Sequence, residues 1–408
     1  MAACGRLSGR DFSNYHRFFN RDRWSALRLS CLLAGLLVSE FVPAWEPLVV
    51  LIDETLERRR GKQIVYKGWF RDAVRSSGNR VVHSLGIRWL CAALLVRVPW
   101  SSRPWALPFF VVPVLSEKTC QRLKRPHRGA IGWTLALVTR LRRWFPTREI
   151  VLVGDGGFAA VELFHHCQQG NPPLTFICRL RFDAALYAFP DPQPKGKRGP
   201  KPKKGRRQSK LSERLTDRKT GWQRVTIPWY GGGLKTVEIA TGVALWYTPG
   251  QKPAPLRWVL VRPRHNDPEP FKPVALGCSR QRLAAERIAR WFVARWNIEV
   301  TFQEVRAQLG FETGRHWSRA AVGRVTPCLF GLFSLVVVLA HQLYPEQLPC
   351  RQSGWYQKEE AKFSDALAAV RRHLWGAEEY LPSPEAADDC LIPRALLAAL
   401  HHVACYST

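Results

Sequence analysis

The sequence predicts an α/β protein with a mixed β-sheet flanked by helices. Short apolar runs bounded by turn-forming residues predict buried strands at residues 48–53, 86–98, 105–115, 149–154 and 174–181. Apolar residues recurring at helical spacing predict helices at residues 10–45, 117–145 and 159–169. Strands and helices in this order are typical of one sheet covered by helices.

A β-rich insertion precedes the last long helix of the predicted core. Residues 222–262 are rich in Trp, Val and Thr and contain a turn at Gly231–Gly233, so we expect short strands there. Residues 280–309 contain neither Gly nor Pro and predict one long helix. A chain of 408 residues allows two or three domains. The divisions we expect are a helical N-terminal region (1–45), a first part of the core (46–182), a basic loop with the β-rich insertion (183–279), the last core helix with the helix after it (280–345), and a helical tail (346–408).

The charge balance indicates a polyanionic partner. The chain has 62 Lys and Arg against 32 Asp and Glu, a net charge of +30, which favours nucleic acid or an anionic membrane. Residues 192–210 hold nine Lys or Arg and no acid, and their Pro and Gly exclude regular structure. We interpret them as a mobile loop that tethers DNA phosphates, with a solvated linker as the alternative. Its candidate DNA contacts are Lys197, Arg198, Lys203, Lys204, Arg206 and Arg207.

Cysteine usage and hydropathy predict a cytoplasmic protein. The eleven Cys are scattered without a C-x-x-C pair, and the first residues contain no long apolar run. The segment Thr326–Tyr344 lacks charged residues and barely reaches the length of a bilayer span, about 20 residues. We expect it to be a buried core helix, so no membrane partner is expected; a basic membrane-surface protein is the alternative.

The last predicted core helix carries an acid on an otherwise apolar and basic face. Steps of three and four residues put six side chains on that face: Ile288, Phe292, Arg295, Glu299, Phe302 and Arg306. One interpretation is a structural i,i+4 ion pair between Arg295 and Glu299. The other is a carboxylate that points into a shared acidic site.

Two further acids favour the shared site. Asp53 and Asp155 each directly follow an apolar run that predicts a buried strand. Carboxylates gathered at the end of a sheet repel one another and favour a divalent cation, and oxygen ligands suit Mg²⁺ or Mn²⁺. Two such ions can hold both the attacking and the leaving oxygen of a phosphodiester.

The pattern Phe292-x2-Arg295-x3-Glu299-x6-Arg306 resembles the Tyr-x2-Arg-x3-Glu-x6-Lys signature of bacterial insertion-sequence transposases of the DDE superfamily. Asp53 in LIDETLERRRGK and Asp155 in VLVGDGGFAA resemble the first two acids of that family's triad. The segments FICRLRFDAALYAF and WNIEVTFQEVRAQLGFETGRHWSR add to a similarity that covers most of residues 12–345. Phe replaces the signature's Tyr and Arg replaces its Lys, which changes how DNA would be positioned more than the metal chemistry.

The resemblance implies an RNase H-like fold and a DNA transposase. Asp53, Asp155 and Glu299 would hold two Mg²⁺ ions, with Mn²⁺ able to substitute, and would support cleavage at transposon ends followed by strand transfer. Phe292, Arg295, Arg306 and Arg315 would contact DNA, with His316 and Arg319 as further candidates. For Trp229, Trp246 and Trp258 we prefer core packing over stacking on a base.

The same resemblance implies partners and a location. The protein would bind terminal repeats and target DNA as a homodimer in a synaptic complex, associated with the nucleoid. Residues 1–45 would be a shortened DNA-binding region.

Two other functions fit parts of the sequence. The segment Gly154–Ala160 matches G-x-G-x-x-A, the dinucleotide-binding fingerprint, and Asp183 follows at a distance that suits an NAD(P)-dependent oxidoreductase. The motif lies in mid-chain without the repeating βαβ units that should follow it. A catalytically inactive DNA-binding remnant of a transposase is the second alternative.

Overall fold

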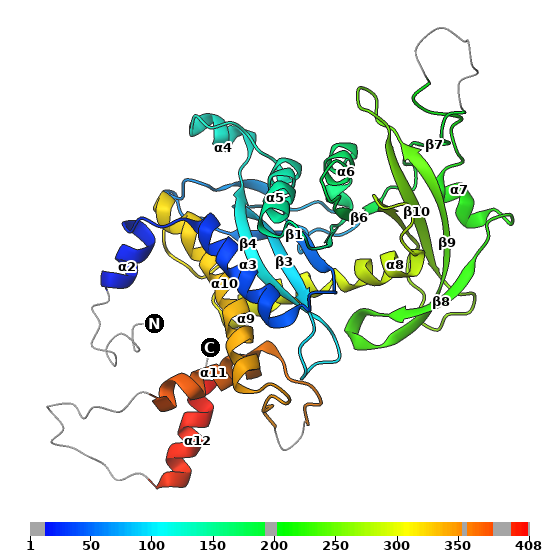
Figure 1. The fold of residues 1–408 in the computed structure, drawn as a ribbon. Helices are drawn as coiled ribbons and strands as arrows, with labels where there is room; N and C mark the ends of the chain where they lie inside the picture. Colours follow the sequence, from blue (N-terminus) through cyan, green and yellow to red (C-terminus); the bar gives the residue numbers. More distant parts are fainter. Residues whose placement is uncertain (1–12, 192–201, 353–356, 378–392, 407–408) are drawn as a thin grey trace.

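One sheet of eleven strands runs through the protein. The computed structural model describes residues 13–191, 202–352, 357–377 and 393–406. In these residues the strands follow the order β2-β3-β1-β5-β6-β11-β10-β9-β7, with β4 added to β3 and β8 added to β9. Helices cover the sheet, as Figure 1 shows, which confirms the expected mixed α/β fold.

The core of the sheet combines antiparallel and parallel strands. β1 (Leu48–Arg58), β3 (His83–Val96) and β4 (Trp105–Val114) form an antiparallel set, and β2 (Gly68–Arg71) pairs with the start of β3. β5 (Ile150–Val153) pairs parallel with β1, and β6 (Thr175–Leu180) pairs parallel with β5. Residues 48–52 and all of β5 are buried, so helices must cover both faces of the sheet here.

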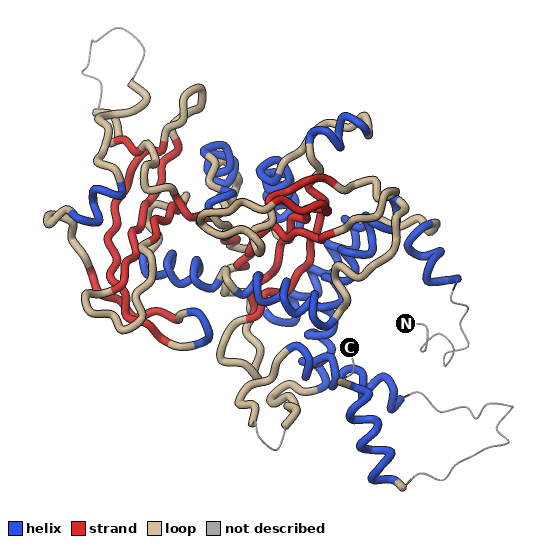
Figure 2. Tube along the Cα trace, turned by 180° about the vertical axis from the view of Figure 1, so that it is seen from behind, coloured by secondary structure: helices blue, strands red, loops and turns tan. Residues whose placement is uncertain are grey.

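Helices from both ends of the chain cover one face. α3 (Ala26–Phe41), α9 (Asn297–Gln308) and α10 (Arg319–Leu343) all contact β4, and α9 also contacts β1. The other helices of the core are α2 (Ser13–Asn20), α4 (Glu117–Arg122), α5 (Ala130–Trp144) and α6 (Val161–Gln168). α5 and α6 pack together on the side away from α10 (Figures 1 and 2). At the C-terminal end, α11 (Phe363–Ala377) packs on α10 and α12 (Arg394–Cys405) packs on α11.

The insertion extends the core sheet and does not form a separate one. Its elements are β7 (Leu186–Tyr187), α7 (Leu211–Thr216), β8 (Gln223–Pro228), β9 (Leu234–Trp246), β10 (Ala254–Pro263) and β11 (Val274–Cys278). β11 pairs antiparallel with β6, so the ladder crosses the division that we expected between residues 182 and 183. Figure 1 shows the insertion at the end of the molecule opposite α2.

β1 is longer than the apolar run that predicts it. The sequence predicts a strand ending at Asp53, followed by a basic loop, yet the strand continues to Arg58. The extension is stable because its charged side chains find buried partners. Glu57 accepts hydrogen bonds from Trp89 Nε1 at 2.8 Å and from Thr326 Oγ1 at 3.0 Å, and it pairs with Arg59 at 2.7 Å. Asp53 is therefore in mid-strand and does not end it.

Three of the helices expected to be continuous are divided. The predicted helix at 10–45 is α2 and α3, separated by residues 21–25. The predicted helix at 117–145 is α4 and α5, separated by a segment that contains Pro126. The predicted helix at 280–309 is α8 (Ala285–Ala294) and α9. Arg295 and Trp296 join these two, and backbone hydrogen bonds to their carbonyls shorten to the i→i−3 type at Ile298 and Glu299.

α10 is a core helix with one uncovered stripe. Within the described residues it is the helix long and apolar enough to cross a membrane by length and composition. Phe330, Phe333 and Val337 are buried, whereas Leu332 and Leu339 are exposed. Its packing against β4 makes it part of the core, as the sequence predicts.

We predict that Gly86→Ala destabilises the protein by about 1–3 kcal/mol, the usual cost of overpacking. Gly86 lies opposite Arg58 in the β1–β3 ladder, and a Cβ there would lie 2.3 Å from the Glu57 carbonyl oxygen. The matched control is Gly35→Ala in α3, where an added Cβ meets nothing within 4 Å. It should stabilise the helix by about 0.5–1 kcal/mol. Urea unfolding measures both, and a Gly86→Ala protein as stable as the wild type would contradict this register.

Candidate active site

Strand register places Asp53 beside Asp155. The parallel pairing of β1 and β5 ends with Leu51 opposite Val153, so Asp53 and Asp155 occupy the next equivalent position on the same face of the sheet. Adjacent strands lie about 4.8 Å apart. The backbone holds both carboxylates: Asp53 Oδ1 accepts from Glu54 N at 2.8 Å, and Asp155 Oδ1 accepts from Gly157 N at 2.8 Å. Two acids that are about a hundred residues apart in the sequence are thereby neighbours.

Arg295 connects Glu299 to this pair. Its Nη1 lies 2.5 Å from Asp53 Oδ2, and its Nη2 lies 3.0 Å from Glu299 Oε1. The Arg295 side chain is 12% exposed, and its buried Nε has no partner among the described residues. Arg295 lies at the junction of α8 and α9, which brings its guanidinium over β1. The i,i+4 ion pair and the shared acidic site were two alternative interpretations of the sequence, and the geometry contains both.

Because its carboxylates are buried and repel one another, this site is stabilised by positive charge. Burial raises the pKa of Asp53 to about 7; Arg295 opposes the rise, while Asp155 and Glu299 add to it. Burial also raises the pKa of Glu299, again against the effect of Arg295. For Arg295, burial alone would lower the pKa, but the surrounding carboxylates raise it. One guanidinium among three carboxylates leaves the site net negative.

The donor set fits a divalent cation. Three carboxylates from β1, the loop after β5, and α9 supply the oxygen ligands that Mg²⁺ prefers. In the described part of the chain, no three His, Cys, Asp or Glu side chains are already gathered as a coordination shell. Arg295 lies between Asp53 and Glu299 and supplies the positive charge there. The residues therefore fit an ion that enters beside, or in exchange for, this guanidinium.

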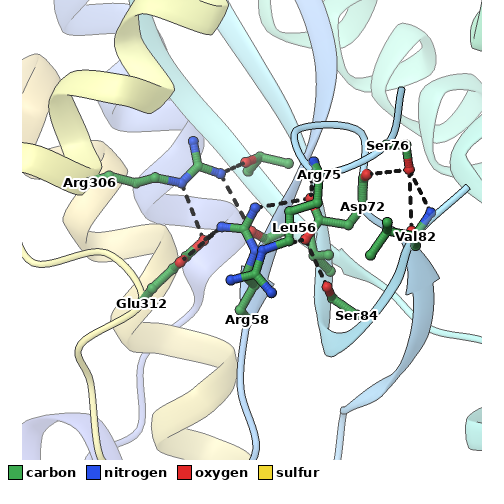
Figure 3. Close-up of polar contacts among 10 residues, drawn as sticks. Leu56, Arg58, Asp72, Arg75, Ser76, Val82, Ser84, Arg306 and Glu312 are labelled. Atoms are coloured by element: carbon green, nitrogen blue, oxygen red, sulfur yellow. Dashed lines mark hydrogen bonds and ion pairs between the residues drawn. The ribbon is translucent and has the colours of Figure 1, made fainter. Parts of the chain in front are cut away.

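Arg306 anchors the loop that follows α9 (Figure 3). Its Nη2 donates to Thr55 Oγ1 at 2.6 Å, and its Nε donates to Glu312 at 3.3 Å. Arg58 Nη1 also donates to Glu312, at 3.2 Å, while Arg58 Nε and Nη2 hold Asp72 at 2.7 and 2.9 Å. All three guanidinium nitrogens of Arg306 have acceptors within the chain, so the structure favours a positioning role over the direct phosphate contact that we expected.

The other residues that we expected to contact DNA differ in their burial and in their partners. Phe292 is buried behind Arg295, so direct contact with DNA is not what its position supports. Lys204 Nζ lies between the rings of Tyr187 and Tyr247, at 4.0 and 3.7 Å from their centroids, and is thus part of the fold. The remaining expected contacts in the described part of the chain are exposed: Lys203, Arg206, Arg207 and Arg315, with Arg319. Lys197 and Arg198 lie outside the described residues.

The basic segment is partly ordered by the neighbouring strand. Its second half, residues 202–210, runs beside β7 and is fixed by backbone hydrogen bonds between Gly205 and Ala188 and between Gln208 and Leu186. The expectation of a mobile loop is therefore wrong for these residues, because the backbone of β7 supplies partners that composition could not reveal.

The tryptophans pack as we preferred, and two other aromatic residues lie near the acids. Trp258 is buried, Trp246 packs edge-on against Phe164, and Trp229 packs on Phe271. Tyr230 and Trp296 have ring centroids 5.8 Å apart and are both exposed. Tyr230 interacts electrostatically with Arg295 and Glu299, and burial raises its pKa. We did not identify these two residues from the sequence. The features that could have identified them are a Tyr in a glycine-rich turn and a Trp next to Arg295.

The turn that matches G-x-G-x-x-A has a structural explanation. A Cβ on Gly154 would lie 3.1 Å from Phe158 and 3.2 Å from Ile52, so glycine lets β5 pack closely. The Gly157 N–H that could face a pyrophosphate instead donates to Asp155. The segment therefore serves to hold Asp155 and does not form a nucleotide cradle.

The chain was compared with family models, curated proteins and solved structures. The sequence model described as DDE superfamily endonuclease matches residues 2–233, more than half of the chain, and includes Asp53 and Asp155 but not Glu299. Among solved structures, the piggyBac transposase synaptic complex with hairpin DNA matches with 13% identity and a TM-score of 0.41. The match covers 84% of this chain and 56% of that one, so the chain spans just over half the length of that protein. No curated protein matches the chain.

We predict that Asp72→Asn destabilises the protein at neutral pH by about 1.5–3 kcal/mol, the worth of hydrogen bonds to charged groups. Hydrogen bonds from Arg58 lower the pKa of Asp72 to about 2. A carboxylate with a lowered pKa contributes stability above its unfolded pKa of about 4, and that stability is lost as the pH falls toward 2.

Urea unfolding at pH 7 and pH 3 measures the difference between Asp72→Asn and wild type, which should be smaller at pH 3. The control is Asp183→Asn, which removes an exposed carboxylate paired with Arg181 and should change the stability little, because solvent screens this ion pair. An equal cost for both variants at pH 7 would contradict the network of Figure 3.

Proposed function

Because this chain belongs to the DDE superfamily of endonucleases, we propose that it is a transposase that cuts DNA at transposon ends and joins those ends to target DNA. The observation that carries the proposal is the meeting of Asp53, Asp155 and Glu299 around Arg295. The net charge of +30 supports DNA as the substrate. Insertion-sequence origin, terminal-repeat recognition and a homodimeric synaptic complex belong to the same proposal and derive from the resemblance of the motifs.

The chain's own residues bind and orient the reacting groups. Asp53, Asp155 and Glu299 would hold two Mg²⁺ ions, or Mn²⁺, which when bound supply Lewis acidity at the attacking and leaving oxygens. Arg295 fixes the rotamers of Asp53 and Glu299 through its two terminal nitrogens. Arg306 and Thr55 fix α9 against β1, so that Glu299 stays over the sheet. Tyr230 and Trp296 form an aromatic wall beside the acids.

The proposed chemistry consists of two displacements at phosphorus. In the first, water forms a P–O bond while the bond to the 3′ oxygen breaks, leaving a 3′-hydroxyl and a 5′-phosphate. In the second, that 3′-hydroxyl attacks a target phosphodiester and displaces a target 3′-hydroxyl. No redox partner is required.

A non-catalytic DNA-binding remnant is the second candidate, and one observation favours it. Arg295 pairs with both Asp53 and Glu299, so part of the negative charge of the site is neutralised within the chain. Such a protein would keep the basic surface and bind DNA without cutting it.

We predict that the purified protein nicks DNA that flanks its own gene when Mg²⁺ or Mn²⁺ is present, and that Asp155→Asn reduces the rate on the order of 10³-fold or more, because an ion ligand is lost. Gel analysis of labelled duplex measures nicking. The matched control is Asp183→Asn, an exposed Asp away from the site, which should nick at the wild-type rate.

Metal binding provides a readout that is independent of catalysis. Titration calorimetry with Mn²⁺ should detect binding to wild type and Asp183→Asn and a loss of affinity in Asp155→Asn. A wild-type protein that binds DNA but neither nicks it nor binds Mn²⁺ would contradict the transposase proposal and support the remnant.

A further inference from the structure

A basic groove lies at the end of β1, beyond the acidic site. Residues 58–64 form one wall and residues between Glu312 and Trp317 form the other, around a volume of about 980 Å³. Five of the lining side chains are cationic and one is acidic. The groove uses neither Asp53, Asp155 nor Glu299.

The inner cations of the groove build its walls. Arg58 is neutralised by Asp72 and Glu312, and Arg59 is neutralised by the buried Glu57. Arg59 Nη2 also donates to the backbone carbonyl of His316, which ties the second wall to β1. These two arginines hold the walls together and have little capacity left for a ligand.

The outer cations of the groove are free for a ligand. Arg60, Lys62 and Arg315 are exposed, and no acceptor within the described chain lies at hydrogen-bond distance from their side chains. Trp317, at 58% exposure, lines the same groove and offers an apolar surface. Three unpaired cations on two facing walls suit a ligand that carries repeated negative charge.

Contacts within the chain hold both walls of the groove. Lys67 Nζ donates to the carbonyls of Gly61 and Lys62 at 2.7 and 3.1 Å and closes the turn after β1. On the opposite wall, a Cβ at Gly314 would lie 2.4 Å from the His316 ring, so the two residues are closely packed. Glu312 has a φ of +78°, a costly conformation for a residue with a side chain, and its two arginine partners hold it there.

β1 connects the groove to the acidic site. Arg60 follows Asp53 by seven residues, which at about 3.3 Å per extended residue corresponds to about 23 Å. One strand of duplex DNA carries a phosphate about every 3.4 Å along the axis, so this span corresponds to about seven phosphates. The inference rests on the proposed function, because it assigns a position to the DNA that the acidic site would cut. We propose that the groove of Arg60, Lys62 and Arg315 binds the DNA phosphate backbone about seven nucleotides from the scissile bond.

The test compares two triple variants that remove the same charge. Arg60→Gln, Lys62→Gln and Arg315→Gln are combined in one protein. Arg97→Gln, Arg143→Gln and Arg394→Gln, all exposed residues outside the groove, are combined in the control. Binding to a labelled 40-base-pair duplex is measured in EDTA between 50 and 200 mM salt, so that cleavage plays no part. The groove variant should bind on the order of 10²-fold more weakly at low salt, with a salt slope reduced by about 0.9 per lost contact.

A crosslink provides a second measurement that does not depend on these variants folding. Replacing Gln63, which lines the groove, with p-benzoylphenylalanine should yield a photocrosslink to the duplex, and the same replacement at Leu396 on α12 should not. The groove proposal is overturned if the two triple variants have equal affinity and salt slope. It is also overturned if position 63 gives no crosslink while the protein binds DNA. Either result leaves the proposed function intact. Failure of the wild type to bind DNA overturns both.

Discussion

The fold is organised around the ion pairs of Arg295. Its guanidinium holds Asp53 on β1 in a largely buried pair, where removal of one partner typically costs about 3–5 kcal/mol, and it also pairs with the more exposed Glu299 on α9. Arg295 lies at the junction of α8 and α9, so these pairs fix the junction to β1. The pair with Glu299 also fixes the position of α9 on the sheet. Two turns further along α9, the contact between Arg306 and Thr55 holds the helix to β1 again. The acidic site is therefore a consequence of how the last core helix is attached to β1.

The sequence predicts the acids better than the elements that carry them. Asp53 and Asp155 follow apolar runs that are buried on both faces of the sheet, so their position at the end of the β1–β5 ladder follows from local patterning. The length of β1 could not be predicted, because Glu57 is stable in the core only through Trp89 and Thr326, which are far away in the sequence. The junction at Arg295 could not be predicted from a Gly or Pro, since both junction residues keep helical dihedrals.

Residue type alone could not separate the cations that build the fold from those available to a ligand. Arg306 and Lys204 match expectations for DNA contacts, but the first is bound to Thr55 and Glu312 and the second lies between two tyrosine rings. Arg60 and Lys62 belong to a run that seemed to be an ordinary basic loop, yet they are unpaired and face a groove. What decides is whether carboxylates, hydroxyl or carbonyl oxygens, or aromatic rings already surround each cation, which depends on contacts between distant segments.

The continuous ladder from β6 into β11 links the insertion mechanically to the acidic site. The Gly154 N–H, one residue before Asp155, donates to the Ile177 carbonyl on β6, and β6 is hydrogen-bonded to β11 of the insertion. The path from the outer strands to Asp155 therefore runs through paired strands. A force that bends the insertion would displace Asp155 along this path, so the shape of the insertion and the geometry of the acids are coupled.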